Sequence, residues 1–160
     1  MNLSIRAGVH GQGVFAEQAI PCGARIMDFT GPFLRHCQTT PDTLAVQIGP
    51  DLYLGASGGP DDRVNHSCDP NAGLVIGQGP VHLIAIRDIA AGEEICFDYS
   101  TTMDEDNWQM TCRCGAPRCR RIIRDGKHLP QEVWDRYLAM GIIPGYVQAA
   151  RQRLVRAAVP

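Results

Sequence analysis

Long apolar runs are missing from this chain of 160 residues, in which no stretch approaches the ~18 consecutive apolar residues of a membrane span. Residues 1–12 hold no apolar core, so a secretory signal is not expected. A strong charge of either sign is also missing, because the formal net charge is −2, and this gives no reason to expect direct binding to nucleic acid. Internal repeats, low-complexity stretches and interdomain linkers are absent too. We therefore expect one globular domain with no membrane contact and no nucleic-acid partner.

Cysteine is present in an odd number, seven, which a complete disulfide framework would not use up. Three of these residues, Cys112, Cys114 and Cys119, follow the spacing C-x-C-x4-C, which leaves a tetrahedral zinc ion one ligand short. Cys68 is the natural fourth ligand. Four thiolates leave no open position for water, so the pattern predicts one structural zinc ion per chain.

The other three cysteines would be free thiols, which suits a reducing compartment better than export: Cys22, Cys37 and Cys96. We expect an intracellular protein, cytoplasmic in a bacterium or nuclear in a eukaryote. A disulfide framework and unrelated core cysteines are the alternatives to the zinc site.

Short apolar segments separated by glycine and proline dominate the first 100 residues and predict a mainly β structure. We expect strands at residues 14–16, 25–29, 44–48, 52–54, 72–76, 81–86 and 94–98. The last part of the chain has helical periodicity instead, with four large side chains on one face of residues 130–140: Val133, Trp134, Tyr137 and Leu138. A second helix is expected at about residues 145–157. In the simplest interpretation these helices cover a sheet, and in the other they border a substrate groove.

Three motifs follow one another along the chain. Residues 65–71 read Asn-His-Ser-Cys-Asp-Pro-Asn, residues 92–99 read Gly-Glu-Glu-Ile-Cys-Phe-Asp-Tyr, and residues 112–119 hold the clustered cysteines. This order resembles the SET-domain protein lysine methyltransferases with a post-SET zinc-binding tail. The resemblance implies a mainly β (α+β) fold, the SET-domain β-clip of several small sheets, with a C-terminal pseudoknot, a post-SET zinc site and C-terminal helices.

The resemblance also divides the chain. Residues 1–103 correspond to the SET domain, residues 104–125 to the post-SET zinc-binding segment, and residues 126–160 to a C-terminal helical extension. No pre-SET cysteine cluster precedes the domain, so we expect a minimal version of the family.

The activity implied by the resemblance is methyl transfer from S-adenosylmethionine to the ε-amine of a protein lysine, in a histone or another basic protein. The alternative is a catalytically weak SET-like module that binds a protein or peptide. Two departures from the family pattern support the alternative. Phe29 stands where the family carries a tyrosine, and before Asn65 either Arg63 replaces an aromatic residue of the family or one residue has been lost. The sequence predicts neither the identity of the substrate nor the oligomeric state.

A Gly-Gln-Gly segment precedes the three motifs, and its glycines permit close backbone approach or positive φ. It is not a dinucleotide fingerprint, because the third glycine and the following helix signal are missing. The resemblance assigns cofactor binding to five residues here and in the first motif: His10, Gly11, Gln12, Asn65 and His66. Ordinary turns are the alternative interpretation of both segments.

Tyr99 is the expected catalytic residue, and the resemblance gives it a part in cofactor binding as well. Methyl transfer to an amine needs a deprotonated lysine, alignment and exclusion of water. A tyrosine near its ordinary pKa of ~10 serves as a positioning group rather than a base. The alternative for Tyr99 is a core tyrosine at the end of a strand.

Phe29 and Phe97 are expected to form aromatic walls of a lysine channel, with Tyr53 as a third wall. Because Phe97 cannot hold a water molecule as a tyrosine would, we expect di- or trimethylation.

Overall fold

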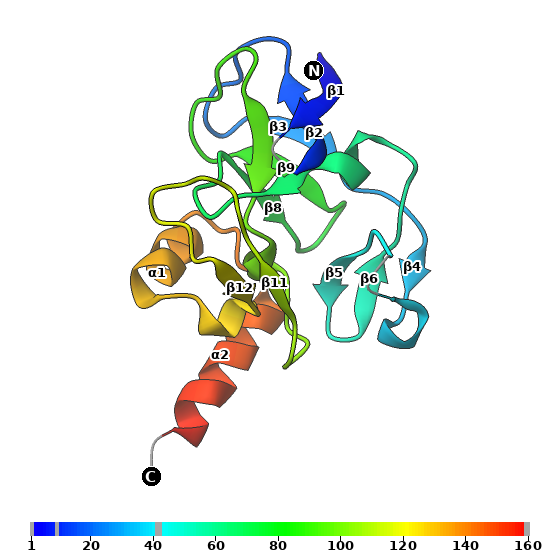
Figure 1. Cartoon of the computed structure of the whole chain (residues 1–160). Helices are drawn as coiled ribbons and strands as arrows, with labels where there is room; N and C mark the ends of the chain where they lie inside the picture. The colour runs from blue at the N-terminus through cyan, green and yellow to red at the C-terminus, as the bar shows by residue number, and fades with distance from the viewer. Residues whose placement is uncertain (1, 9, 41–42, 159–160) are drawn as a thin grey trace.

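The computed structural model describes residues 2–8, 10–40 and 43–158, and within them the strands form several small sheets rather than one large one (Figure 1). The sheets contain four, three, three and two strands. The mainly β expectation is therefore confirmed.

The strands, in chain order, are β1 (Leu3–Gly8), β2 (Gly11–Ala16), β3 (Arg25–Asp28), β4 (Phe33–Leu34), β5 (Val46–Gly49), β6 (Leu52–Leu54), β7 (Asn65–His66), β8 (Ala72–Val75), β9 (His82–Ala85), β10 (Glu94–Phe97), β11 (Gln109–Thr111) and β12 (Ile122–Arg124). The helices are α1 (Gln131–Ala139) and α2 (Gly145–Ala157), and short 3-10 turns include η2 (Pro60–Arg63) and η3 (Tyr99–Thr101). All seven expected strands and both expected helices are present, with ends shifted by a few residues.

The largest sheet, ordered β1-β2-β10-β7, joins segments that lie far apart in the sequence. Strand β10 is antiparallel to β2 and parallel to β7, where Cys96 faces Asn65 and Phe97 faces His66. Parallel strands cannot be joined by a tight turn, so a long connection must separate them. This pairing places the motif that begins at Asn65 beside the one that ends at Tyr99.

The main core is shared by this sheet and the sheet β3-β9-β8. Val14 and Ile95 come from the first sheet, Leu74 and Leu83 come from the second, and all four side chains have 0% exposure. Burial of such side chains supplies the dominant favourable free energy of folding. The third sheet, β4-β6-β5, lies beside this core (Figure 1).

The C-terminal helices pack against the outer part of this framework. A second core cluster contains Trp134 and Tyr137 from α1, with Ile84 of β9 packed against it. A Cβ on Gly73 of β8 would lie 2.5 Å from Cγ2 of Ile142, so the helix–helix connection rests directly on the sheet. The helices thus cover a sheet face, as the simplest interpretation expected.

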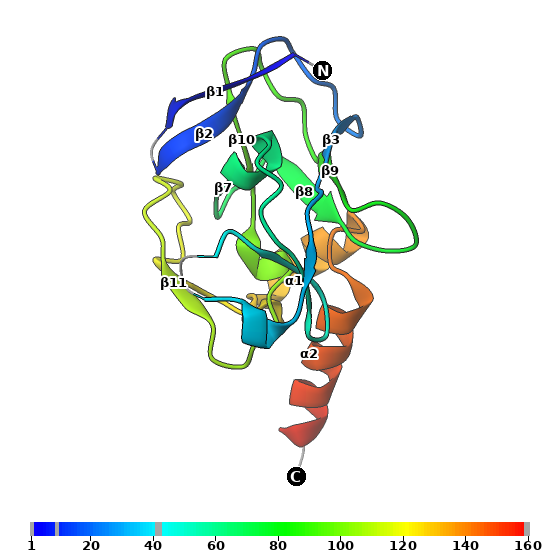
Figure 2. The ribbon, with the colours of Figure 1, turned by 90° about the vertical axis from the view of Figure 1, so that its right-hand side faces the viewer.

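The apolar face of α1 is only partly buried. Leu138, which shares this face with Trp134 and Tyr137, is 41% exposed, so α1 buries a narrower stripe than its apolar pattern allows. Helix α2 projects away from the sheets toward the C-terminus (Figure 2). Among the described residues, neither helix has both the length and the apolar character required to span a membrane.

We expect Ile142→Ala to lower the free energy of unfolding by roughly 2–5 kcal/mol, because it opens a cavity between the helices and β8. Urea denaturation measures the change. The control is Leu154→Ala in α2, whose side chain is 41% exposed and whose loss should stay within about 0.5 kcal/mol. Equal losses in the two variants would contradict this packing.

Candidate active site

Tyr99 lies where β10 gives way to the 3-10 turn η3, and its ring is held in one orientation. The Tyr99 hydroxyl donates to the backbone carbonyl of Val64 at 2.8 Å. Burial raises the pKa of Tyr99, and the nearby Cys96 and Glu94 act in the same direction. The hydroxyl therefore stays protonated at neutral pH, and Tyr99 is suited to positioning rather than to accepting a proton.

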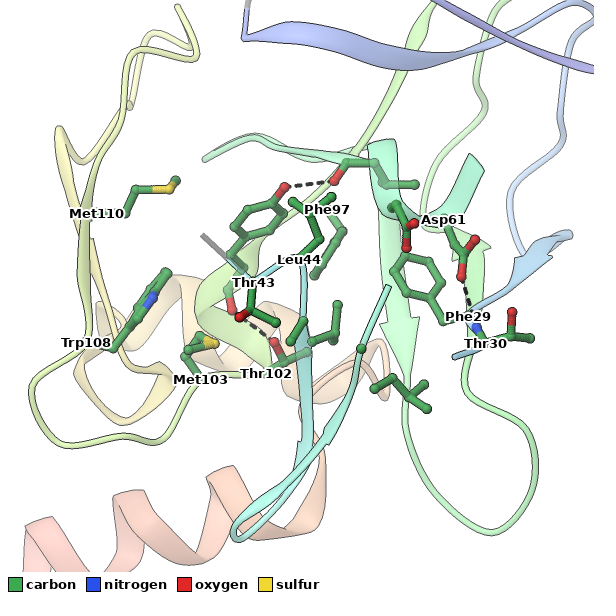
Figure 3. A pocket seen from close by; sticks show the side chains of 17 residues that line it. Phe29, Thr30, Thr43, Leu44, Asp61, Phe97, Thr102, Met103, Trp108 and Met110 are labelled. Atoms are coloured by element: carbon green, nitrogen blue, oxygen red, sulfur yellow. Dashed lines mark hydrogen bonds between the residues drawn. The ribbon is translucent and has the colours of Figure 1, made fainter. Parts of the chain in front are cut away.

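Two cavities meet at Tyr99. The first, of about 240 Å³, is lined by aromatic and aliphatic side chains that include Phe29, Phe97 and Trp108 (Figure 3). The second, also about 240 Å³, is lined by more polar residues. Tyr99 and Met110 line both cavities, so the chain presents an apolar and a polar chamber on either side of one tyrosine.

The apolar cavity has aromatic walls. The rings of Phe29 and Phe97 meet edge to face with centroids 6.0 Å apart, and those of Phe97 and Tyr99 are 4.9 Å apart. Phe29 is 6% exposed and Phe97 is 3% exposed. Such a chamber accommodates an alkyl chain, and its ring faces attract a cation. The structure brings Phe29, Phe97 and Tyr99 together as the sequence predicted.

The polar cavity is lined by four of the six residues expected around a cofactor, together with Met110, Thr111 and Cys112; the four are His10, Asn65, His66 and Tyr99. Gly11 and Gln12 were expected there too, but they do not line it. The Asn65 side-chain amide donates to the carbonyl of Gln12 at 3.1 Å and to Oε1 of Glu94 at 2.7 Å. Gly11 has a φ of +96°, which favours glycine. A Cβ at Gly13 would lie 2.1 Å from Glu94 Oε1, so a larger residue there would displace the carboxylate that accepts from Asn65.

His66 joins Tyr99 to the cysteines. The backbone N–H of Tyr99 donates to Nδ1 of His66 at 3.1 Å, so a neutral ring carries its proton on Nε2. That nitrogen lies 3.4 Å from Sγ of Cys68 and donates to it. Burial lowers the pKa of His66 to about 4, although Asp98 acts in the opposite direction, which is consistent with a neutral ring.

The four cysteines predicted to bind zinc lie together. The sulfur atoms of Cys68, Cys112, Cys114 and Cys119 are all within 4.8 Å of one another. Cys68 and Cys112 have their sulfurs 3.7 Å apart, close to the ~3.8 Å edge of a tetrahedron built from Zn–S bonds of ~2.3 Å.

Backbone donors face the same sulfurs. The N–H of Cys68 points to Sγ of Cys114, and the N–H of Arg120 points to Sγ of Cys68, each at 3.4 Å. Such donors favour thiolates. All seven cysteines are free, so the donor set fits a zinc ion and not the disulfide alternative.

Tyr53 does not join the lysine channel as predicted. Its hydroxyl donates to Glu105 at 2.6 Å and lies 3.2 Å from Nδ1 of His36, whereas its neighbour Leu54 lines the apolar cavity. Successive residues of a strand face opposite sides, so β6 turns Leu54 inward and Tyr53 away.

The sequence analysis did not identify most of the residues that line the apolar cavity, among them Asp61, Trp108 and Met110. Asp61 comes from η2, and its carboxylate accepts from the backbone N–H of Thr30 at 2.9 Å. The other two come from the segment that leads into the cysteines. A tryptophan and a methionine among charged residues were the available signal, since apolar side chains in a polar stretch need a surface to cover.

The SET domain profile matches residues 11–100, more than half of the chain, and the chain therefore belongs to the SET domain family. It is 28% identical over 134 residues to histone-lysine N-methyltransferase 2B of Homo sapiens, which covers 74% of this chain and 5% of that protein. It is 30% identical over 139 residues to histone-lysine N-methyltransferase ATX2 of Arabidopsis thaliana, which covers 75% of this chain and 13% of that protein. The chain thus spans a small part of the length of these relatives, and the family includes protein-lysine methyltransferases.

Solved structures share the fold. A structure of KRYPTONITE in complex with mCHH DNA, an H3(1-15) peptide and SAH superposes with a TM-score of 0.63 at 23% identity. The match covers 77% of this chain and 29% of that one. A second KRYPTONITE complex, with mCHG DNA and SAH, gives a TM-score of 0.61 at 24% identity and covers 76% and 28% of the two chains. The SET-domain fold inferred from the motifs is confirmed.

We expect purified protein to contain about one zinc ion per chain, because four converging thiolates complete a tetrahedral site. Cys114→Ser should lower both the zinc content and the affinity for S-adenosylmethionine, since the adjoining Thr111 and Cys112 line the polar cavity. Elemental analysis and calorimetry measure the two effects. The matched control is Cys22→Ser, an exposed cysteine outside the cluster, which should change neither. A folded wild-type protein without zinc would refute the site.

Proposed function

We propose that this chain transfers a methyl group from S-adenosylmethionine to the ε-amine of a protein lysine. The observation that carries the proposal is the meeting of two cavities at Tyr99, one apolar and aromatic, the other polar and bordered by Asn65 and His66. The first suits the alkyl stem of a lysine, and the second suits the cofactor. The relatives named as histone-lysine methyltransferases support the same activity.

S-adenosylmethionine, when bound, supplies an activated methyl group whose leaving group is a neutral thioether. The residues of the chain must then align a neutral amine and keep water away. Phe29 and Phe97 exclude water from the lysine stem, and burial there lowers the pKa of the incoming ammonium group. The amine releases its proton to solvent before transfer.

Tyr99 orients the amine. Its hydroxyl hydrogen is already engaged by the Val64 carbonyl, which leaves an oxygen lone pair free to accept an N–H from the lysine. The raised pKa of Tyr99 keeps this arrangement unchanged across the neutral range. The rate should therefore follow deprotonation of the substrate and not of this tyrosine.

Zinc has a structural part in the proposal. Cys68, Cys112, Cys114 and Cys119 would hold it, and it would fix the segment that closes the polar cavity. Free thiols and thiolate ligands persist in a reducing environment, so we place the protein inside a cell.

The substrate is proposed to be a basic, histone-like protein. Asp61 and Asp62 line the apolar cavity, and no arginine, lysine or histidine of the described chain forms a salt bridge with either. Uncompensated negative charge at a cavity favours a cationic side chain. One relative, from Mycosarcoma maydis, is described as specific for lysine 4 of histone H3, and one KRYPTONITE structure contains an H3 peptide.

Tyr99→Phe should reduce methyl transfer by about one to four powers of ten while the affinity for S-adenosylmethionine is retained, because it deletes the hydroxyl that orients the amine. The assay uses radiolabelled S-adenosylmethionine with a panel of histones and cell lysate, and calorimetry follows cofactor binding. Wild-type rates in the variant would remove Tyr99 from the reaction. Wild-type protein that binds the cofactor without any transfer would favour the peptide-binding module instead.

The wild-type product should reach di- or trimethyl-lysine, because Phe97 itself contributes no hydroxyl that could hold a water molecule beside the amine. Phe97→Tyr adds that hydroxyl and should shift the product toward monomethyl-lysine. Mass spectrometry at high enzyme concentration distinguishes the products. A wild-type reaction that stops at one methyl group, with an identical result for Phe97→Tyr, would contradict this account of the channel.

A further inference from the structure

Asp98, the residue before Tyr99, has a fully buried side chain that the mechanism above does not use. It lines neither of the two cavities. Its Oδ1 accepts from the backbone N–H of Ser100 at 3.1 Å and so caps the turn η3, on which Tyr99 is the first residue. The position of this carboxylate therefore fixes the backbone that carries Tyr99.

The counter-ion of Asp98 comes from the zinc-binding segment. Arg120, which follows the ligand Cys119, donates from Nη2 to Asp98 Oδ1 at 2.7 Å, and its side chain is 15% exposed. Its Nε and Nη1 atoms are buried without a hydrogen-bond partner in the described part of the chain. Asp98 is the carboxylate that compensates the charge of this buried guanidinium.

The second carboxylate oxygen is held by the C-terminal extension. The hydroxyl of Tyr137, a residue of α1 with 0% exposure, donates to Asp98 Oδ2 at 3.2 Å. Both oxygens of the carboxylate are thus fixed by groups from beyond the matched SET region, which ends at residue 100.

The backbone of Tyr99 is also held by His66, whose Nδ1 lies 3.6 Å from Asp98 Oδ1. Its N–H donates to His66, whose ring contacts Cys68. The short stretch of backbone that carries the Tyr99 ring is therefore held by both His66 and the Asp98 carboxylate. A displacement of either support would move the hydroxyl that faces the two cavities.

We propose that Asp98 is the positioning residue for Tyr99, and that Arg120 and Tyr137 hold it there, so that the zinc-binding segment and α1 together set the orientation of the catalytic tyrosine. This inference rests on the methyl-transfer function proposed above. A purely structural ion pair is the rival explanation, and it predicts a loss of stability with unchanged turnover.

The test is a comparison of kcat, peptide KM and cofactor affinity. Asp98→Asn keeps the shape of the side chain and removes its charge, and kcat should fall roughly 10- to 100-fold with KM and cofactor affinity unchanged, as expected for a misplaced reacting group. Arg120→Met should have a similar effect. Arg120→Lys, which restores a cation, should recover part of the lost kcat.

Arg120→Met leaves a charged carboxylate buried alone, so a neutral double variant is made beside it. Asp98→Asn with Arg120→Met removes both charges, and its loss of kcat should be smaller than the product of the two single losses. Independent, multiplicative losses would show that the two residues do not act as a unit and would overturn the proposal.

Arg118→Met is the matched control. Arg118 lies two positions earlier in the same segment and forms an exposed ion pair with Glu132 of α1 at 2.9 Å. The same loss of charge there should leave kcat unchanged, because exposed pairs contribute little. An equal fall in kcat for Arg118→Met and Arg120→Met would assign the effect to the segment as a whole and overturn the role of Asp98.

A readout without activity separates this proposal from the proposed function. The chain has four tyrosines, so 3-fluorotyrosine labelling gives four fluorine NMR signals, and Tyr99→Phe identifies that of Tyr99. Asp98→Asn and Arg120→Met should shift or broaden the Tyr99 signal, and Arg118→Met should not. A wild-type protein without methyl transfer would refute the function alone, whereas an unchanged Tyr99 signal in Asp98→Asn would refute the positioning.

Discussion

The parallel pairing of β7 with β10 is the constraint on which the site depends. It joins only two residues from each strand, Asn65 and His66 with Cys96 and Phe97, and backbone hydrogen bonds of ~1 kcal/mol each would not hold so short a pair. Side chains supply the rest. The buried amide of Asn71 donates to the carbonyl of Glu94 at 2.8 Å and accepts from the N–H of Cys96 at 2.9 Å.

This explains why the two motifs occur together in one sequence. Asn65 bonds Glu94, His66 accepts from the backbone of Tyr99, and Asn71 clamps the strand between them. The first motif is therefore one side of an interface, and the second motif is the other. Cys68 extends the same interface to the cysteine-rich segment. Asn65, His66, Cys68 and Asn71 thus each have an identified partner, and the family resemblance has a physical basis in these contacts.

The sequence was sufficient where a residue's partners are near it in sequence or its chemistry is restrictive. The central strands follow from apolar segments bounded by turns, and the cysteine cluster follows from spacing, because few arrangements suit four thiolates. The sequence was insufficient where the direction of a side chain decides whether the residue lines a cavity. Tyr53 and Leu54 are adjacent large hydrophobic residues, so the sequence does not show which of them faces the cavity. The pleat of β6 turns only Leu54 toward it. Strands β11 and β12 have three residues each, too few for a periodic pattern, so periodicity did not predict the contribution of Met110.

The buried charges near Tyr99 support a functional rather than a stabilising role for the C-terminal segments. Transferring Asp98 and Arg120 from water into the interior costs several kcal/mol per ion, and their attraction does no more than offset this when the geometry is good. An apolar pair of similar volume would often give equal or greater stability. An apolar pair could not fix the orientation of the side chain. The Asp98 carboxylate accepts from Ser100, Arg120 and Tyr137 at once, and one orientation satisfies all three donors. The residue that follows it is the tyrosine at the junction of the two cavities, where a small displacement changes the distance between the reacting atoms.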